Sequence, residues 1–410
     1  MDGKKTLHWT VAVAALGYFV DIYDLQLFNI VSKSSLIGLG VTDPKEIESW
    51  DYLLFLWQMG GMLVGGLIWG WLGDTKGRRN ILFGSILLYS LANIANAFVT
   101  NVEAYSAIRF IAGLGLAGEL GAAITLVSEL MDKEKRGYGT MVIVTMGALG
   151  AVAAVFVSKI QWTLFELAPW QMSYIIGGGL GLILLGLRMG TFESDTFEET
   201  QAMEISKGKW TMLFANKERA LRYLALIAIG LPVWYSVGIL IKFSKKFALL
   251  QNLEIEISHA IVFTYLGLSV GDLLSSLISQ WLRSRKKTVF IYLITAVVVI
   301  AYYLWIPITS TWMFYLLCFL IGTGTGYWAL FVSMSAELFG TNLRATVAST
   351  TPNFVRGAVV PLVLTFKAWE GPLGAAGAAT ILGLISLGLA FWGVSHLKES
   401  FGKDLNYHEY

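Results

Sequence analysis

The first apolar run of the chain contains the stretch GYFVDIYDLQLFN, residues 17–29. The run covers roughly residues 9–31 and is long enough to cross a lipid bilayer as a helix. Asp21 and Asp24 are three residues apart, so they share one face of this helix. One aspartate at the centre of a span costs about 2.5 to 3.5 kcal/mol on insertion scales. We therefore expect the face with both aspartates to point into protein or water and to have a function there.

The composition shows that the rest of the chain is of the same kind. Hydrophobic residues make up 56% of the 410 positions and charged residues 14%, whereas a soluble domain has about 25% charged residues. The sequence therefore predicts an all-α membrane protein. Twelve apolar segments have spanning length, at roughly residues 8–32, 51–73, 80–99, 103–130, 138–160, 170–192, 219–242, 258–282, 287–306, 311–338, 345–368 and 373–396.

Signals for several other classes of protein are missing from the sequence. The single cysteine, Cys318, lies in an apolar run, so we expect neither a disulfide framework nor a metal site. GLGLAG at residues 113–118 matches a dinucleotide fingerprint by letter, but it lies inside a predicted span, where small residues serve helix packing. The sequence has no metalloprotease, P-loop or nucleophile-elbow pattern. We expect no enzymatic activity, no cofactor and no nucleic-acid partner.

The positive charges predict the orientation. Most of the 30 Lys and Arg residues, Arg188 among them, fall on one side of the predicted spans. The positive-inside rule places that side and both termini in the cytoplasm. We expect an N-terminal six-helix bundle over residues 1–195, a cytoplasmic linker over 196–216, a C-terminal six-helix bundle over 217–400 and a cytoplasmic tail over 401–410. The expected location is the bacterial inner membrane.

The two halves repeat each other in sequence. SEL at residues 128–130 and the arginine at 136 return as AEL at 336–338 and the arginine at 344, and Gly118 returns as Gly326, each 208 positions later. Two halves of like orientation predict parallel repeats about an axis along the membrane normal. The substrate site of such a protein is expected near the midplane between the halves.

Three motifs resemble those of the major facilitator superfamily. GWLGDTKGRR, residues 70–79, resembles its G-x-x-x-D-[RK]-x-G-R-[RK] loop, with Thr75 where Arg or Lys is usual. R-x-x-x-G-x-G at residues 109–115 resembles its proton-coupling motif, and ELFGTNLRAT at 337–346 resembles the span-10 exit of sugar-porter-like and metabolite:proton symporter branches. The resemblance covers nearly the whole chain. It implies twelve transmembrane helices in two pseudo-symmetric six-helix bundles that transport by alternating access.

Other residues resemble particular branches. DIYDL at residues 21–25 is similar to the D-x-[FY]-D element of aromatic-acid:proton symporters and to the D-x-Y-D-L element of phosphate:proton symporters. Arg356 resembles the span-11 arginine of aromatic-acid and organic-anion carriers. Leu-Gly follows Glu119 where the phosphate family has Tyr-Pro, which favours an organic anion.

Four residues are candidates for proton coupling: Asp21, Asp24, Glu119 and Arg109. Two carboxylates on one buried face favour proton binding, because neighbouring negative charges are costly in a membrane and a bound proton relieves that cost. The alternative for the aspartates is a structural ion pair with Arg109, and for Glu119 a role as the counter-charge of Arg109. The resemblance favours coupling for Arg109.

Arg356 is the candidate anchor of the substrate. Its guanidinium is a fork suited to carboxylate or phosphate, and the alternative is a private ion pair with Asp272, whose own role stays open. Other polar and aromatic side chains are candidates for lining the substrate cavity, with simple packing as the alternative: Tyr23, Gln26, Gln58, Tyr235, Tyr327, Trp328 and Asn353.

Charged residues at the cytoplasmic span ends recur in both halves and form the candidate gate, with solvated interface charge as the alternative. They are Asp74, Arg78, Glu129, Arg136, Glu337 and Arg344. At the opposite side, Lys242 is expected to extend to the membrane interface from the outer end of the seventh span.

These observations predict a secondary active transporter that carries a small organic anion, a carboxylate or aromatic acid, by proton-coupled symport. The alternatives are a phosphate symporter, a transporter of a neutral or cationic metabolite, and a receptor without turnover. The expected partners are the small-molecule substrate, protons and the lipid bilayer, and the expected oligomeric state is a monomer.

Overall fold

The computed structural model describes residues 3–160, 167–188 and 209–409. The helices of the first half are α1 (Gly3–Gly38), α2 (Pro44–Lys76), α3 (Arg78–Asn96), α4 (Val102–Leu116), α5 (Glu119–Leu130), α6 (Arg136–Lys159) and α7 (Pro169–Leu187). Those of the second half are η3 (Trp210–Leu213), α9 (Lys217–Tyr235), the π-helix η4 (Ser236–Ile241), α10 (Ser244–Leu250), α11 (Ile257–Leu282), α12 (Arg285–Trp305), α13 (Thr311–Thr325), α14 (Trp328–Glu337), α15 (Thr341–Gly357) and α16 (Val359–His396).

Twelve spans can be traced through these helices, as the sequence predicts. Ten helical stretches are long and apolar enough to cross a membrane, and Asn80–Asn96 is a shorter apolar helix. One of the ten, Thr341–His396, contains a break at Gly374, whose φ of 70° is not helical. This stretch therefore accounts for two spans. The predicted all-α, twelve-helix fold is confirmed.

Polar residues begin several helices at the membrane surfaces. Asn101 accepts a hydrogen bond from the Ala104 N–H at 2.7 Å and so caps α4. The Ser284 hydroxyl accepts from the Lys287 N–H at 3.2 Å and caps α12. Such caps satisfy backbone donors that have no partner inside the helix.

Two spans are interrupted at matching places in the repeat. The fourth span breaks between α4 and α5 beside Gly118, and the tenth breaks between α13 and α14 at Gly326. A Cβ at Gly118 would lie 2.6 Å from the Ser85 Cβ, and one at Gly326 would lie 2.6 Å from the Gly271 Cα. Close packing therefore requires glycine at both positions. Interrupted spans in corresponding positions of two repeats are a feature of transporter binding sites.

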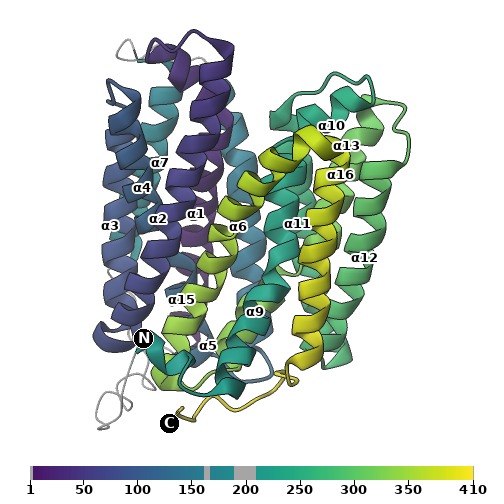
Figure 1. Ribbon diagram of the computed structural model, residues 1–410. Helices are drawn as coiled ribbons and strands as arrows, with labels where there is room; N and C mark the ends of the chain where they lie inside the picture. The colour runs from purple at the N-terminus through teal and green to yellow at the C-terminus, as the bar shows by residue number, and fades with distance from the viewer. Residues whose placement is uncertain (1–2, 161–166, 189–208, 410) are drawn as a thin grey trace.

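The two halves lie side by side and meet most closely at the end with both termini (Figure 1). Helix α2 packs against α15 and α6 packs against α11, while α5 and α14 add contacts between the halves. Toward the opposite end the halves separate, and a cavity of about 560 Å³ lies between them. Large apolar side chains cover the outside; Trp281, for example, is 82% exposed, as expected of a lipid-facing surface.

The predicted boundary at residue 195 and the first part of the linker, 196–208, lie outside the described residues. The described end of the linker contains η3 and leads into α9. The tail after α16 is described as far as residue 409.

Candidate functional site

An acid and a base from different halves meet at the centre of the protein. Asp21 of α1 and Arg356 of α15 are both fully buried, and Asp21 Oδ2 lies 3.6 Å from Arg356 Nη2. Arg356 Nη2 also donates a hydrogen bond to the Tyr18 hydroxyl at 3.3 Å. The carboxylate is within ion-pair distance of the guanidinium but beyond ordinary hydrogen-bond distance. The sequence-based alternative of a private Arg356–Asp272 pair is wrong, because Asp21 is the partner.

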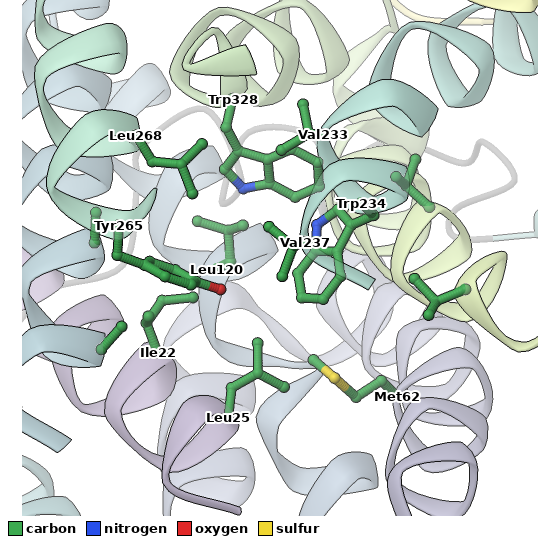
Figure 2. Close-up of a cluster of buried hydrophobic side chains, with 14 of the residues drawn as sticks. Ile22, Leu25, Met62, Leu120, Val233, Trp234, Val237, Tyr265, Leu268 and Trp328 are labelled. Atoms are coloured by element: carbon green, nitrogen blue, oxygen red, sulfur yellow. The ribbon is translucent and has the colours of Figure 1, made fainter. Parts of the chain in front are cut away.

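Aromatic side chains enclose this pair. The Arg356 guanidinium lies 5.6 Å from the centre of the Trp234 ring and 6.0 Å from that of Trp328. Figure 2 shows apolar side chains of both halves, Ile22 among them, pointing toward one another around these tryptophans. Arg356 Nε and Nη1 are buried without a hydrogen-bond partner among the described residues. The site thus combines aromatic walls with cationic donors that remain available.

Asp272 lies beside the same site but has a different partner. It accepts a hydrogen bond from the Ala329 N–H at 2.8 Å and so caps the start of α14, directly after the break at Gly326. Asp272, Tyr18 and Trp328 together line a small cavity of about 30 Å³. The polar start of a broken helix is therefore held by a carboxylate that lines the central cavity with Tyr18 and Trp328.

A second acid and base lie deeper in the first half. Asp24 and Arg109 are fully buried, and neither carboxylate oxygen nor any guanidinium nitrogen has a hydrogen-bond partner among the described residues. The charge of Arg109 acts on Asp24, and its guanidinium lies 5.0 Å from the centre of the Phe28 ring and 5.7 Å from that of Tyr174. Asn93 adds two more buried polar atoms without a partner in the described chain. Buried polar groups of this kind commonly hold ordered water in proteins.

Glu119 forms an ion pair with Arg188, and both side chains are buried. The sequence-based alternative, in which Glu119 is the counter-charge of Arg109, is therefore wrong. Arg188 follows the last residue of α7 and turns into the protein rather than toward the surface. Glu119 and Arg188 neutralise each other through direct contact. Asp24 and Arg109 make no such contact with each other.

Two of the seven predicted cavity-lining residues line a cavity, and the other five lie elsewhere in the packed helices. Trp328 lines the small central cavity and Gln26 lines the large one. The hydroxyls of three predicted residues donate to backbone carbonyls within their own halves, which favours packing: Tyr23 to Ser173, Tyr235 to Ala379 and Tyr327 to Ile229. Asn353 donates to the Ala117 carbonyl at 2.8 Å and so joins the halves, and Gln58 is buried without a hydrogen-bond partner among the described residues.

Three of the predicted gate residues connect the halves directly at the end with the termini. Asp74 of α2 accepts from the N–H and the hydroxyl of Thr346 in α15, at 2.8 and 2.7 Å. Glu129 of α5 lies 2.9 Å from Arg344 of α15, and both side chains are fully buried. The Arg78 side chain lies outside the described residues.

The remaining gate residues contact the C-terminal tail. Arg136 donates to the Lys403 carbonyl at 2.9 Å, although it belongs to the first half. Glu337 accepts from Arg285 at 3.1 Å and from the Ser400 hydroxyl at 2.7 Å. The tail therefore lies across this end and contacts both halves, a role that the sequence pattern did not predict.

The repeat symmetry extends to hydrogen bonds. Arg136 Nε donates to the Ser128 carbonyl and Arg344 Nε donates to the Ala336 carbonyl, both at 3.1 Å. The sequence echo therefore marks equivalent turns, each with an arginine that holds the end of the preceding helix.

Comparisons with known proteins agree with this architecture. The family model of the Major Facilitator Superfamily matches residues 14–363. A gentisate transporter of Corynebacterium glutamicum is 25% identical over 351 residues, which cover 82% of this chain and 76% of the relative. A niacin transporter, NiaP, of Acinetobacter baylyi is 33% identical over 174 residues, 42% of this chain and 37% of the relative. The solved structure of the proton:xylose symporter XylE superposes with a TM-score of 0.76 at 14% identity and covers 98% of each chain, which shows a shared fold.

Proposed function

Because the chain belongs to the major facilitator superfamily of membrane transporters, we propose that it carries a small organic anion, a carboxylate or aromatic acid, by proton-coupled symport. The observation that supports this most strongly is the pair formed by Asp21 and Arg356. In this proposal Asp21 binds the proton and Arg356 binds the anion, and the two side chains lie 3.6 Å apart between the two halves.

The coupling follows from competition for one guanidinium. An anion that enters while Asp21 is ionised meets a repulsion of about 4 kcal/mol for charges 4 Å apart at an effective dielectric constant of about 20. A proton on Asp21 removes that repulsion and leaves Arg356 to the substrate. The loaded site is then close to neutral and can be closed off, whereas a half-loaded site keeps an unpaired buried charge that opposes closure.

The walls of the site favour an aromatic acid over phosphate. Trp234 and Trp328 lie side by side, with ring centres 6.3 Å apart, and both lie within 6.0 Å of the guanidinium. They give the site an apolar aromatic surface, against which an aromatic ring packs well. Inorganic phosphate has no apolar part that could pack against these rings. The gentisate and niacin transporters among the relatives are consistent with this choice.

The proposed cycle is alternating access between bundles 1–195 and 217–400, which are joined by the linker 196–216. In this proposal the protein lies in a bacterial inner membrane, and the end with the termini and the tail 401–410 faces the cytoplasm, as the positive-inside rule favours. The contacts of Asp74 and of Glu129 would then close the cytoplasmic side, while the cavity of about 560 Å³ opens outward. We propose that one chain suffices for transport.

The proton assignment can be tested by binding alone. Benzoate binding to the purified protein should tighten as the pH falls from about 8 to about 5, since Asp21 must take up a proton before Arg356 is released. The Asp21→Asn variant should bind benzoate equally well across this range. Arg356→Gln should lose binding at every pH, and Arg356→Lys should keep a weakened part of it. Binding by Asp21→Asn that depends on pH as steeply as in the wild type would contradict the proposal.

The second acid tests the number of protons. We assign Asp24 beside Arg109 and Glu119 beside Arg188 as further proton-coupling pairs. Asp24→Asn should therefore lower the number of charges moved per substrate molecule in proteoliposomes. An unchanged number of charges per substrate would leave Asp21 as the coupling acid and give Asp24 a structural role.

A further inference from the structure

A mostly buried lysine lines the outer cavity, the cavity of about 560 Å³ between the two halves. Lys242 follows the last residue of the π-helix η4 in the second half, and its side chain is only 10% exposed. Its Nζ lies 3.1 Å from Asp51 of α2 and donates to the Asn29 side chain of α1 at 3.2 Å. The sequence-based expectation that Lys242 extends to the membrane interface is therefore wrong, because the side chain turns inward against the first half.

A chain of polar side chains continues from this lysine toward the centre. Asn29 donates to Gln26 at 3.1 Å, and Gln26 donates to the Tyr265 hydroxyl at 2.6 Å. Tyr265 lines both the outer cavity and the small central cavity that contains Asp272. This chain of hydrogen bonds therefore connects the lining of the outer cavity with that of the central cavity through Tyr265.

The Lys242–Asp51 pair is suited to exchange. Both members are mostly buried and come from different halves, with side-chain exposures of 10% and 15%. Removing Asp51 alone would leave an uncompensated buried cation, which is strongly unfavourable. A substrate carboxylate that takes the place of Asp51 keeps Lys242 paired, and the displaced Asp51 carboxylate faces the outer cavity that it lines. Phe55, which lines the outer cavity, lies with its ring centre 5.2 Å from Nζ and supplies an apolar wall for the rest of an organic anion.

We propose that Lys242 is an outer binding residue for the substrate carboxylate, and that Asp51 is the counter-charge which this carboxylate displaces. The pair thereby forms a gate between the outer cavity and Arg356 that opens for anions. This inference rests on the proposed function, since it requires an anionic substrate.

Opposite effects of the two partners provide the test. Initial rates of benzoate uptake into proteoliposomes give KM and kcat for each variant. Lys242→Gln should raise KM about tenfold or more, as expected for the loss of a hydrogen bond to a charged group, and Lys242→Arg should restore most of the affinity. Asp51→Asn removes the competitor and should lower KM severalfold. A purely structural ion pair would instead make both Lys242→Gln and Asp51→Asn worse in the same direction.

An isosteric variant tests the inference without loss of the pair. Asn29→Asp adds a second carboxylate beside Lys242 and should raise KM severalfold. The control is Lys245→Gln, which removes an exposed lysine that lines the same cavity and has no ion pair among the described residues. Its KM should stay within about twofold of the wild type.

The outcomes separate this inference from the proposed function. A wild-type protein that takes up neither benzoate nor nicotinate overturns the proposed function and this inference with it. Wild-type uptake together with raised KM in both Lys242→Gln and Asp51→Asn, or with an unchanged KM in Asn29→Asp, overturns this inference alone.

Discussion

The ion pair of Glu129 and Arg344 gives the sharpest prediction about the conformational change. It joins α5 to α15 across the two halves at 2.9 Å, and both side chains are fully buried. The Coulomb energy at this distance is about 6 kcal/mol at an effective dielectric constant of about 20. Much of that energy is offset by desolvation, and removal of one partner from a buried pair costs about 3 to 5 kcal/mol in practice.

We predict the effect of Glu129→Gln from these values. The glutamine can still accept a hydrogen bond from Arg344, and Arg344 keeps its bond to the Ala336 carbonyl at 3.1 Å. The cost to the state closed at the terminal end should therefore be about 2 to 3 kcal/mol. In the state that is open at the terminal end, water hydrates both side chains, so the substitution costs that state little stability. The equilibrium should shift toward the open state by roughly 30- to 150-fold.

Distances between spin labels can measure this shift. Labels at Lys76→Cys on α2 and Lys287→Cys on α12 report the separation of the halves at the terminal end, and the single native cysteine, Cys318, is buried. Glu129→Gln should add a population with a longer distance. The exposed Glu134 provides a matched control, because Glu134→Gln removes the same charge without breaking a buried pair. Identical distance distributions for Glu129→Gln and the wild type would refute the role of this pair in closing the terminal end.

Three further predictions concern stability and pH. Arg188→Gln leaves Glu119 buried without its cation and should destabilise the protein by about 3 to 5 kcal/mol. Adding Glu119→Gln removes the unpaired charge and should restore much of the lost stability. Equal thermal stability of the single and double variants would argue against the energetic coupling of this pair. Burial would raise the pKa of Glu399, but hydrogen bonds from Ser284 and three backbone N–H groups hold the pKa below its usual value. Wild type should therefore be more stable than Glu399→Gln above about pH 4.3, the pKa of a glutamate in an unfolded chain. This difference in stability should shrink as the pH falls through the lowered pKa of the folded protein. A difference that grows on acidification would contradict this prediction. The part of benzoate uptake that requires the protein, measured above protein-free liposomes, should fall as the external pH rises from about 5 to about 8, and a flat profile would exclude proton symport.

The architecture was accessible from the sequence because it depends on periodic and repeated signals. Twelve apolar segments predicted twelve spans, and the echo of Gly118 at Gly326 predicted the repeat. The apolar segments predicted continuous helices at both places, and the breaks there appear only in the structure. The paired aspartates were also conspicuous, because a charge inside a span is costly wherever its partner lies. These signals are local or recur at a fixed offset, so one chain without relatives is enough to find them.

The ion-pair partners of the charged residues were harder to predict from the sequence, because they depend on which distant spans pack together. Arg188 has the surroundings of a loop cation in sequence, yet it lies buried against Glu119. Lys242 ends a span and was expected at the interface, yet it faces Asp51, which is 191 positions earlier in the chain. Contacts of the tail likewise leave no mark in hydropathy or charge pattern. Each of these residues was visible as a charge, but its partner required the packed helices.

The central claim is that proton movement and anion movement are obligatorily linked through Asp21 and Arg356. The most direct test is the accumulation of labelled benzoate in proteoliposomes under an imposed pH gradient, acidic on the side where the outer cavity opens, with exchange at equal pH measured in parallel. The wild type should concentrate benzoate beyond the level that diffusion of neutral benzoic acid gives in protein-free liposomes, and Asp21→Asn should exchange benzoate but not exceed that level. Accumulation by Asp21→Asn equal to that of the wild type would contradict the account.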